Sequence, residues 1–273
     1  MAVKVWFTSI DKRNDLRIII YSLFNNKKMP DITIDQGNSS VKIAVWDGTN
    51  LLDEETLPRL DAAVLARIVD RHRPARALCC SVTGNGSRIA AELGRLGVDA
   101  RELSVALPLP VEIGYRTPGT LGPDRIAAAV GAWSMFPGEP LLVVDMGTAV
   151  TYDVVTADGC YLGGNIAPGV GMRLRALRSF TARLPEVNGY GDTPSFGYDT
   201  TTAMRAGAVR GVVAELNYYR SLLPEGTRVV LTGGWSKHVS SFLDYPVTVD
   251  HCLVTKGLLS ILLHPVKAQR ADT

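Results

Sequence analysis

The chain has 273 residues, 46% of them hydrophobic and 21% charged, which is the composition of a soluble globular protein. Its 29 Lys and Arg residues against 27 Asp and Glu exclude a basic field for nucleic acid and an acidic tail, so individually placed groups must bind any anion. No apolar run approaches the about 20 residues that cross a bilayer.

Residues 1–29 precede the first recognisable strand. The apolar stretch Leu16–Leu23 is short and no small-residue cleavage site follows it, so the segment is typical of neither a signal peptide nor a membrane anchor. Met29 stands directly before the strand. We therefore predict that residues 1–29 are an appended segment or a misassigned start, and that a chain beginning at Met29 folds and works like the full-length one.

The first element of the folded part is a strand–turn–strand device. An apolar, β-branched run over Asp31–Ile34 leads into Asp35-Gln36-Gly37-Asn38-Ser39, and a second β-rich run follows over Val41–Trp46. The carboxylate stands at the strand end, and we expect the glycine to provide a positive φ or a close backbone approach. Turn amides beside small polar side chains can bind phosphate oxygens, and a nearby carboxylate can hold a cation.

Lys42 belongs to the same device. Strand alternation places Val41, Ile43 and Val45 on the core face and Lys42 on the opposite face. Lys42 is then either a solvated strand lysine or a phosphate-binding lysine seven residues after Asp35. The turn between them favours the phosphate-binding interpretation.

Residues 60–140 alternate between helical and strand patterns. Apolar residues at helical spacing predict an amphipathic helix over 60–71, a buried strand follows over 77–82, and a further helix carries Ile89, Leu93 and Leu96. After a loop rich in proline and glycine, an alanine-rich helix begins at Asp124 and continues to about Met135. The four cysteines have no metal-ligand or Cys-x-x-Cys spacing, so we expect reduced structural thiols in a cytoplasmic protein.

Asp124 and Arg125 place a carboxylate and a guanidinium side by side at that helix start. Asp124 is either a first-turn aspartate that the helix dipole favours, or a base that the helix N-terminus keeps ionised for a substrate hydroxyl. Arg125 could fork onto a carboxylate.

The second half of the chain repeats the first. The segment Val144-Asp145-Met146-Gly147-Thr148-Ala149 again separates two β-rich runs. A glycine-rich segment over 163–169, expected as a turn, precedes helices near 172–184 and 201–222, a strand over 228–231 and the turn Thr232-Gly233-Gly234, which suits packing against a flat nucleobase or ribose. The halves predict an α/β fold with two lobes of duplicated origin around a nucleotide cleft, over 30–138 and 139–265, followed by a tail over 266–273.

The chain carries five motifs in order: Asp-x-Gly-Asn-Ser-x-x-Lys, Tyr-x-x-Pro-x-x-Leu-Gly-x-Asp-Arg, Asp-x-Gly-Thr-Ala-x-Thr-x-Asp, Gly-Gly-x-Ile-x-Pro-Gly and Thr-Gly-Gly. From about Asp31 to about Leu263 it resembles the bacterial type III pantothenate kinases of the actin/Hsp70/sugar-kinase superfamily. The resemblance implies ATP-dependent phosphorylation of pantothenate to 4'-phosphopantothenate, the first step of coenzyme A synthesis. It also implies two ribonuclease-H-like lobes, a cytoplasmic homodimer, Mg²⁺ with ATP, and a monovalent cation, K⁺ or NH₄⁺, with no nucleic-acid or membrane partner.

The resemblance further implies roles for individual residues. Those that match the ATP-binding positions are Asp35, Gln36, Gly37, Asn38, Ser39, Ser40, Val41, Lys42 and Thr148. Those that match the pantothenate pocket are Tyr115, Gly122, Pro123, Asp124, Arg125 and Thr200. Asp124 matches the catalytic proton acceptor, and Asp145 matches the ligand of the monovalent cation.

Two alternatives remain beside this interpretation. A kinase of the same superfamily with another small acceptor would share the hairpins, and only the resemblance fixes the acceptor. A non-enzymatic relative that acts as a transcriptional accessory factor would have lost the base or gained a basic surface. This chain keeps Asp124 and is nearly neutral, which favours the enzyme.

Overall fold

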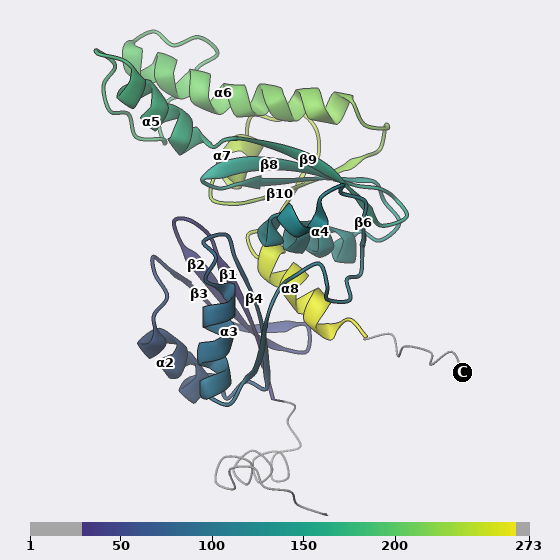
Figure 1. The fold of residues 1–273 in the computed structure, drawn as a ribbon. Helices are drawn as coiled ribbons and strands as arrows, with labels where there is room; N and C mark the ends of the chain where they lie inside the picture. Colours follow the sequence, from purple (N-terminus) through teal and green to yellow (C-terminus); the bar gives the residue numbers. More distant parts are fainter. Residues whose placement is uncertain (1–28, 266–273) are drawn as a thin grey trace, which may run out of the picture.

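The computed structural model of the chain describes residues 29–265. Within them, two β-sheets alternate with layers of helices (Figure 1). The expectations for residues 1–28 and for the tail over 266–273 fall outside the described residues and stay predictions. The lobe boundary between residues 138 and 139 also stays a prediction.

The first sheet contains the first predicted hairpin. Asp35 of β1 lies opposite Lys42 of the antiparallel β2, and β4 and β5 run parallel to β1 on its other side. The strand order is β3-β2-β1-β4-β5. These strands are β1 (Asp31–Gln36), β2 (Val41–Asp47), β3 (Asn50–Leu57), β4 (Arg76–Ser81) and β5 (Asp99–Glu102).

The second sheet repeats this arrangement. Its order, β6-β9-β8-β7-β10-β11, contains the same succession of antiparallel and parallel neighbours around β7 that the first sheet has around β1. The predicted duplication is therefore confirmed in the topology. The strands are β6 (Glu112–Ile113), β7 (Leu141–Met146), β8 (Ala149–Val155), β9 (Cys160–Pro168), β10 (Arg228–Thr232) and β11 (Thr248–Val249).

The helices fill three layers around the sheets (Figure 1). Two pack on the outer face of the first sheet, namely α2 (Ala62–His72) and α3 (Gly86–Arg95). Three pack on the outer face of the second sheet, namely α5 (Val170–Phe180), α6 (Thr200–Ser221) and α7 (Ser236–Ser240). Two lie between the sheets, namely α4 (Pro123–Met135) and α8 (Leu253–Leu263). Within residues 29–265, no helix combines the length and apolar character needed to span a membrane.

Local side chains explain where two of these helices begin. The carboxylate of Asp61 accepts a hydrogen bond of 2.8 Å from the backbone N–H of Val64 at the start of α2. Asp199 and Thr202 form a reciprocal capping box at the start of α6. Such caps contribute about 0.5–2 kcal/mol each, because they satisfy amides that have no partner within the helix.

Helices α4 and α8 touch through their backbones. A Cβ atom on Gly257 would overlap the carbonyl oxygen of Ala127, and one on Gly131 would overlap that of Leu253. Glycine is therefore required at both positions. Helix α8 also packs on the first sheet, where Leu259 contacts a small cluster with Trp46. Helix α8 thus helps to hold the two sheets together.

Two expectations about glycines are wrong. The segment 163–169 is not a turn, because residues 160–168 form β9, and glycine at 164 lets that strand lie against the carbonyl oxygen of Tyr152 in β8. In the two hairpin turns, Gly37 and Gly147 do not have positive φ, and a Cβ atom there would find its nearest neighbours at 3.4 and 3.7 Å. Neither glycine is needed to relieve backbone strain, and both keep side-chain atoms out of the space beside the turns.

Candidate active site

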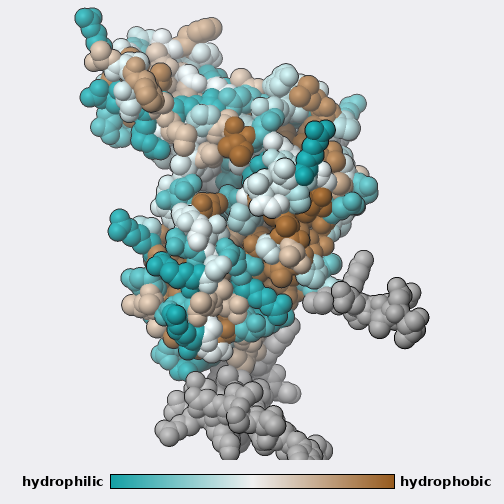
Figure 2. Space-filling view, viewed as in Figure 1, coloured by the Kyte–Doolittle hydropathy of each residue, from teal (hydrophilic) through white to brown (hydrophobic). Residues whose placement is uncertain are grey.

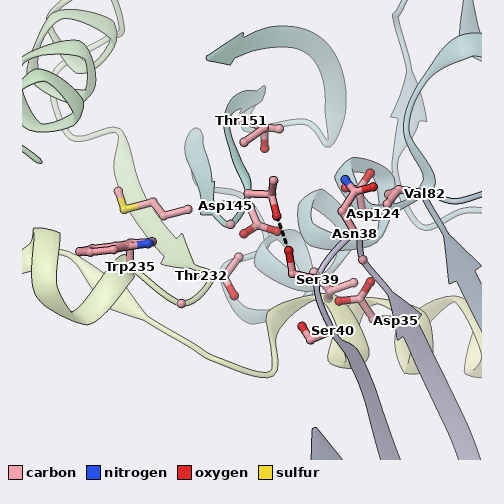
Figure 3. Close-up of a pocket in the computed structure, with 18 of the residues that line it drawn as sticks. Asp35, Asn38, Ser39, Ser40, Val82, Asp124, Asp145, Thr151, Thr232 and Trp235 are labelled. Carbon is pink, nitrogen blue, oxygen red and sulfur yellow. Dashed lines mark hydrogen bonds between the residues drawn. The ribbon is translucent and has the colours of Figure 1, made fainter. Parts of the chain in front are cut away.

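The two hairpin turns meet at a cleft between the sheets. The cleft has a volume of about 400 Å³, and residues of both hairpins line it. The hydroxyl groups of Ser39 and Thr148 are 2.9 Å apart and join one turn to the other, as the dashed line in Figure 3 shows. The two copies of the device therefore face a common space of the size that small-molecule sites have.

The first hairpin supplies most of the predicted nucleotide residues to this cleft, namely Asp35, Gly37, Asn38, Ser39, Ser40 and Lys42. Two predicted residues lie elsewhere. The side-chain oxygen of Gln36 accepts hydrogen bonds from the hydroxyl groups of Ser81, at 2.7 Å, and Thr83, at 3.0 Å. Val41 is a core residue of the first sheet, 2% exposed. Gln36 and Val41 were predicted because they lie within the continuous motif from Asp35 to Lys42, but neither lines the cleft.

Lys42 is on the face that strand alternation predicts. Its ammonium group donates a hydrogen bond of 2.7 Å to the backbone oxygen of His251, in the turn before α8, and the side chain lines the cleft. Val41, Ile43 and Val45 pack in the core on the opposite face. Lys42 is therefore not a freely solvated strand lysine.

Three half-buried carboxylates, Asp35, Asp124 and Asp145, surround the same space (Figure 3). Burial raises the pKa of Asp35 to about 6, although the nearby Cys80 thiol, 3.5 Å away, works in the opposite direction. Burial raises the pKa of Asp145 to about 7, and the charges of the other two carboxylates add to this effect. Each carboxylate thus makes ionisation of its neighbours less favourable, and a bound cation would offset that cost.

Asp124 occupies the first turn of α4, as predicted, and its carboxylate accepts a hydrogen bond of 2.9 Å from the backbone N–H of Arg125. The expectation that the helix N-terminus keeps Asp124 ionised stays a prediction, and the Arg125 amide does act in that direction. Burial raises the pKa of Asp124 and outweighs the lowering by the Arg125 amide. The carboxylate is therefore a stronger proton acceptor than an exposed aspartate.

Arg125 meets a carboxylate of the protein itself. Its side chain is buried, and Nε and Nη2 donate hydrogen bonds of 3.0 and 2.6 Å to Oδ1 of Asp153 in β8. Tyr115 lies next to it, with the guanidinium 6.0 Å from the ring centroid. Neither residue lines the cleft, so the two form a cluster behind Asp124.

The other predicted substrate residues are also away from the cleft lining. Gly122 and Pro123 lead into α4, and Thr200 is exposed at the beginning of α6. Of the six residues predicted for the acceptor, only Asp124 lines the cleft. The sequence of a motif shows which residues are neighbours in the chain, but not which of their side chains line the cleft.

Among the residues that line the cleft without having been singled out in the sequence, an aromatic and a cationic side chain matter most for chemistry. Trp235 follows the predicted turn Thr232-Gly233-Gly234, and Tyr190 stacks on its ring with centroids 4.5 Å apart and planes inclined by 13°. Arg175 comes from α5. The Thr-Gly-Gly turn pointed to the neighbourhood of Trp235, whereas the position of Arg175 depends on how α5 packs, which no local pattern indicates.

This arrangement suits phosphoryl chemistry. The open turns and the cations Lys42 and Arg175 can bind phosphate oxygens, and the flat face of Trp235 can pack against a base. The carboxylates can hold a cation and accept a proton. The residues at Asp35 and Asp145 fit a cation because they are partly desolvated and have raised pKa values.

Comparison with known proteins identifies the family. The family model described as type III pantothenate kinase matches residues 32–221. A type III pantothenate kinase of Phocaeicola vulgatus is 40% identical over 235 residues, covering 85% of this chain and 97% of that protein. One of Porphyromonas gingivalis is 35% identical over 242 residues, covering 86% and 99%.

Solved structures confirm the fold at lower identity. A Campylobacter jejuni protein described as a Baf family transcriptional activator has a TM-score of 0.59 and 20% identity, over 85% of this chain and 96% of its own. A Sinorhizobium meliloti protein described as a 2-dehydro-3-deoxygalactonokinase has a TM-score of 0.54 and 15% identity, over 86% and 99%. The predicted two-lobed α/β fold is confirmed, and the chain belongs to the type III pantothenate kinase family.

Proposed function

We propose that the chain transfers the γ-phosphoryl group of ATP to the primary hydroxyl of pantothenate, in the first step of coenzyme A biosynthesis. Membership of the type III pantothenate kinase family supports this activity. The structural observation that carries it is the meeting of Asp124 with both hairpin turns in one cleft. The transcriptional alternative is not favoured, because the chain keeps the base and the phosphate-binding device together.

ATP binds along the cleft with its triphosphate against the two turns. Lys42, the amides of residues 38 and 39 and those of residues 147 and 148 compensate the charge of the phosphate oxygens, whereas the Gly37 amide closes the turn by donating to the backbone oxygen of Ser40. The base lies at the other end of the cleft, on the face of Trp235 that Tyr190 does not cover. The contacts that support this placement are the Ser39–Thr148 hydrogen bond and the Tyr190–Trp235 stack.

Asp124 acts on the acceptor. Its carboxylate accepts a hydrogen bond from the hydroxyl of pantothenate and orients the oxygen toward the γ-phosphorus. As the new P–O bond forms and the bond to the β-phosphate oxygen breaks, the proton of the hydroxyl passes to Asp124. Little covalent work is required of the protein, since phosphoryl transfer depends mainly on positioning and on charge compensation.

Two kinds of cation fit the carboxylates of the cleft. Mg²⁺, which arrives with ATP, supplies charge compensation at the phosphates, and Asp35 is suited to face it through its partly buried carboxylate. Asp145 holds a monovalent cation, K⁺ or NH₄⁺, whose charge offsets the raised pKa of that carboxylate. Activity is therefore expected to require K⁺ or NH₄⁺ and to be lost with tetramethylammonium at the same ionic strength.

The working form is a cytoplasmic homodimer. Thr200 is exposed and away from the cleft lining, and several large apolar side chains near it are exposed, including Phe180 at 89% and Phe196 at 90%. Figure 2 shows apolar side chains at the end of the molecule that α5 and α6 form. A second copy on this face would cover them and bring Thr200 to an acceptor pocket. The four free thiols agree with a reducing compartment.

The test is ADP release by the purified chain with Mg²⁺, K⁺ and ATP, in the presence and absence of pantothenate. Release that depends on pantothenate, with 4'-phosphopantothenate found by mass spectrometry, is the expected result. Release that depends on a sugar or acetate instead would reassign the acceptor within the superfamily. No release with any acceptor would contradict the enzymatic function.

A further inference from the structure

Asp153 of β8 is fully buried and carries an uneven set of hydrogen bonds. Its Oδ1 atom accepts from Nε and Nη2 of Arg125, at 3.0 and 2.6 Å, and from the hydroxyl of Tyr161, at 2.6 Å. Its Oδ2 atom is buried and has no hydrogen-bond partner among residues 29–265. A buried carboxylate with an unsatisfied oxygen is costly, and such a group calls for an explanation beyond packing.

The partner of Asp153 is connected to the catalytic base by one residue. Arg125 directly follows Asp124 in the first turn of α4, and the backbone N–H of Arg125 donates to the carboxylate of Asp124 at 2.9 Å. The guanidinium of Arg125 therefore ties the turn that carries the base to β8. Strand β8 is in turn paired with β7, so that Thr151 of β8 lies opposite Asp145 at the cleft.

We propose that Asp153 is a positioning residue for phosphoryl transfer, which through Arg125 fixes the first turn of α4 and aims the carboxylate of Asp124 at the acceptor hydroxyl. This role rests on the proposed function of the cleft. Three donors converge on Oδ1 and hold the Asp153 carboxylate in one orientation. Because Oδ2 has no hydrogen-bond partner among the described residues, no other donor pulls the carboxylate away from Arg125. The pair holds a helix start that has no side-chain cap of its own.

The chain contains a matched control for this pair. Asp31, 2% exposed at the beginning of β1, accepts hydrogen bonds of 2.9 and 2.7 Å from the guanidinium of Arg76. Like the Arg125–Asp153 pair, this ion pair involves a buried aspartate, but it joins the neighbouring strands β1 and β4 and neither of its residues lines the cleft. Asp153→Asn and Asp31→Asn each remove one buried carboxylate charge from an arginine, and only the first acts on the base.

The experiment measures kcat and KM for ATP and pantothenate in both variants, with rates expressed per folded molecule from circular-dichroism melting curves. For Asp153→Asn, kcat is expected to fall about 10- to 100-fold while KM for ATP stays within about twofold, because a misplaced base slows the reaction without weakening nucleotide binding. Asp31→Asn is expected to melt at a lower temperature with kcat within about twofold of the wild type.

Two results would overturn the inference: a kcat of Asp153→Asn close to that of the wild type, or an equal loss of kcat in both variants. If Asp153→Asn does not fold, Tyr161→Phe replaces it, since this change removes one donor from Oδ1 and keeps the charge pair. A kcat about threefold lower at unchanged KM for ATP supports the inference, and an unchanged kcat overturns it. A wild-type chain without pantothenate-dependent ADP release would instead reject the proposed function, and this role with it.

Discussion

The carboxylates of the cleft must be charged to function, yet they lie where burial disfavours the charge. They must be ionised to hold cations or accept a proton, yet burial raises the pKa of Asp35 to about 6 and that of Asp145 to about 7. In the ligand-free protein, folding therefore makes ionisation of both carboxylates less favourable than it is in the unfolded chain. The binding energy of the cations and of ATP has to offset this cost, which makes the empty cleft a source of instability at neutral pH.

The first prediction is that Asp145→Asn stabilises the ligand-free protein at pH 8. A raised pKa means that the folded state binds the proton more tightly than the unfolded chain, so the cost is absent below about pH 4 and complete above about pH 7. We expect the variant to gain about 1–3 kcal/mol at pH 8 and much less at pH 4.5.

Thermal melting in a tetramethylammonium buffer measures this effect, because bound K⁺ would stabilise the wild type. The control is Asp244→Asn, an exposed aspartate away from the cleft, which should leave the melting temperature unchanged at both pH values. A variant that is less stable than the wild type at pH 8 would show that Asp145 is held by protein donors and not by a cation.

The second prediction concerns the base. Asp124→Asn keeps the shape and one hydrogen-bond acceptor but cannot take the proton, so kcat should fall by about 10²–10⁴. The affinity for ATP, measured by titration calorimetry, should change little, because the triphosphate lies against the hairpin turns. Turnover near the wild-type rate would remove Asp124 from the role of base.

For individual residues, the sequence was enough to predict which ones lie at strand ends and helix starts, but not which side chains they contact. Asp35 and Asp145 line one cleft because the ends of equivalent strands converge in a duplicated fold, and the first turn of α4 brings Asp124 to the same cleft. The pairing of Arg125 with Asp153 was out of reach, since it depends on how α4 packs against β8. The effect of burial on the pKa of Asp124 could not be predicted either, because burial is a property of the folded molecule.

At the level of elements, the glycines of β9 and of the hairpin turns serve different purposes. A Cβ atom at Gly164 would overlap the backbone of Tyr152, whereas at Gly147 the nearest atom would be 3.7 Å away. Gly164 is required by the fold, and Gly147 faces the nucleotide cleft. Within the same sheet, glycine is therefore needed for strand packing at position 164 and for space in the nucleotide cleft at position 147.

The third prediction compares these glycines. Gly164→Ala should lose about 3 kcal/mol or more of stability, because two paired strands would have to separate. Gly147→Ala should melt within a few degrees of the wild type and raise KM for ATP roughly tenfold, because its methyl group occupies space for phosphate. Melting curves and steady-state kinetics of the two variants decide the matter. A Gly147→Ala enzyme with normal KM for ATP would place the phosphates elsewhere.

The fourth prediction concerns the turn after β10. If the base of ATP stacks on Trp235, Trp235→Ala should weaken binding of ATP by about 1–3 kcal/mol, whereas Trp235→Phe should keep most of it. Inorganic tripolyphosphate, which has no base, should bind all three proteins equally in competition measurements. Equal weakening of ATP and tripolyphosphate by Trp235→Ala would mean that Trp235 supports the turn and does not contact the base.

Most elements could be predicted because their patterns are local. The helix over 60–71 corresponds to α2, and the strand over 77–82 to β4, within two residues at each end. The segment 163–169 was mistaken for a turn because its glycines serve contact with a neighbouring strand, which only the sheet reveals. Strand β6 has two residues and depends on pairing with β9, so it leaves no periodic pattern.

For the whole molecule, the fifth prediction tests the proposed homodimer. Phe196→Ser should shift the molar mass measured by light scattering toward that of a monomer and lower kcat/KM for pantothenate. The matched control is Leu52→Ser on β3 of the first sheet, an exposed apolar residue at 51% that the proposed interface does not include. A dimer that survives the Phe196 change, together with normal kinetics, would locate the interface on another face.

The contact of α8 with the first sheet has a consequence for folding during translation. At about 5–20 residues per second, synthesis of the stretch from β4 to α8 takes roughly 10–40 s. Throughout that time the sheet surface around Trp46 lacks Leu259, the residue of α8 that packs against it. A chain whose translation stops before α8 is made keeps this apolar surface uncovered, and transiently exposed apolar surface of this kind makes a chain prone to aggregation.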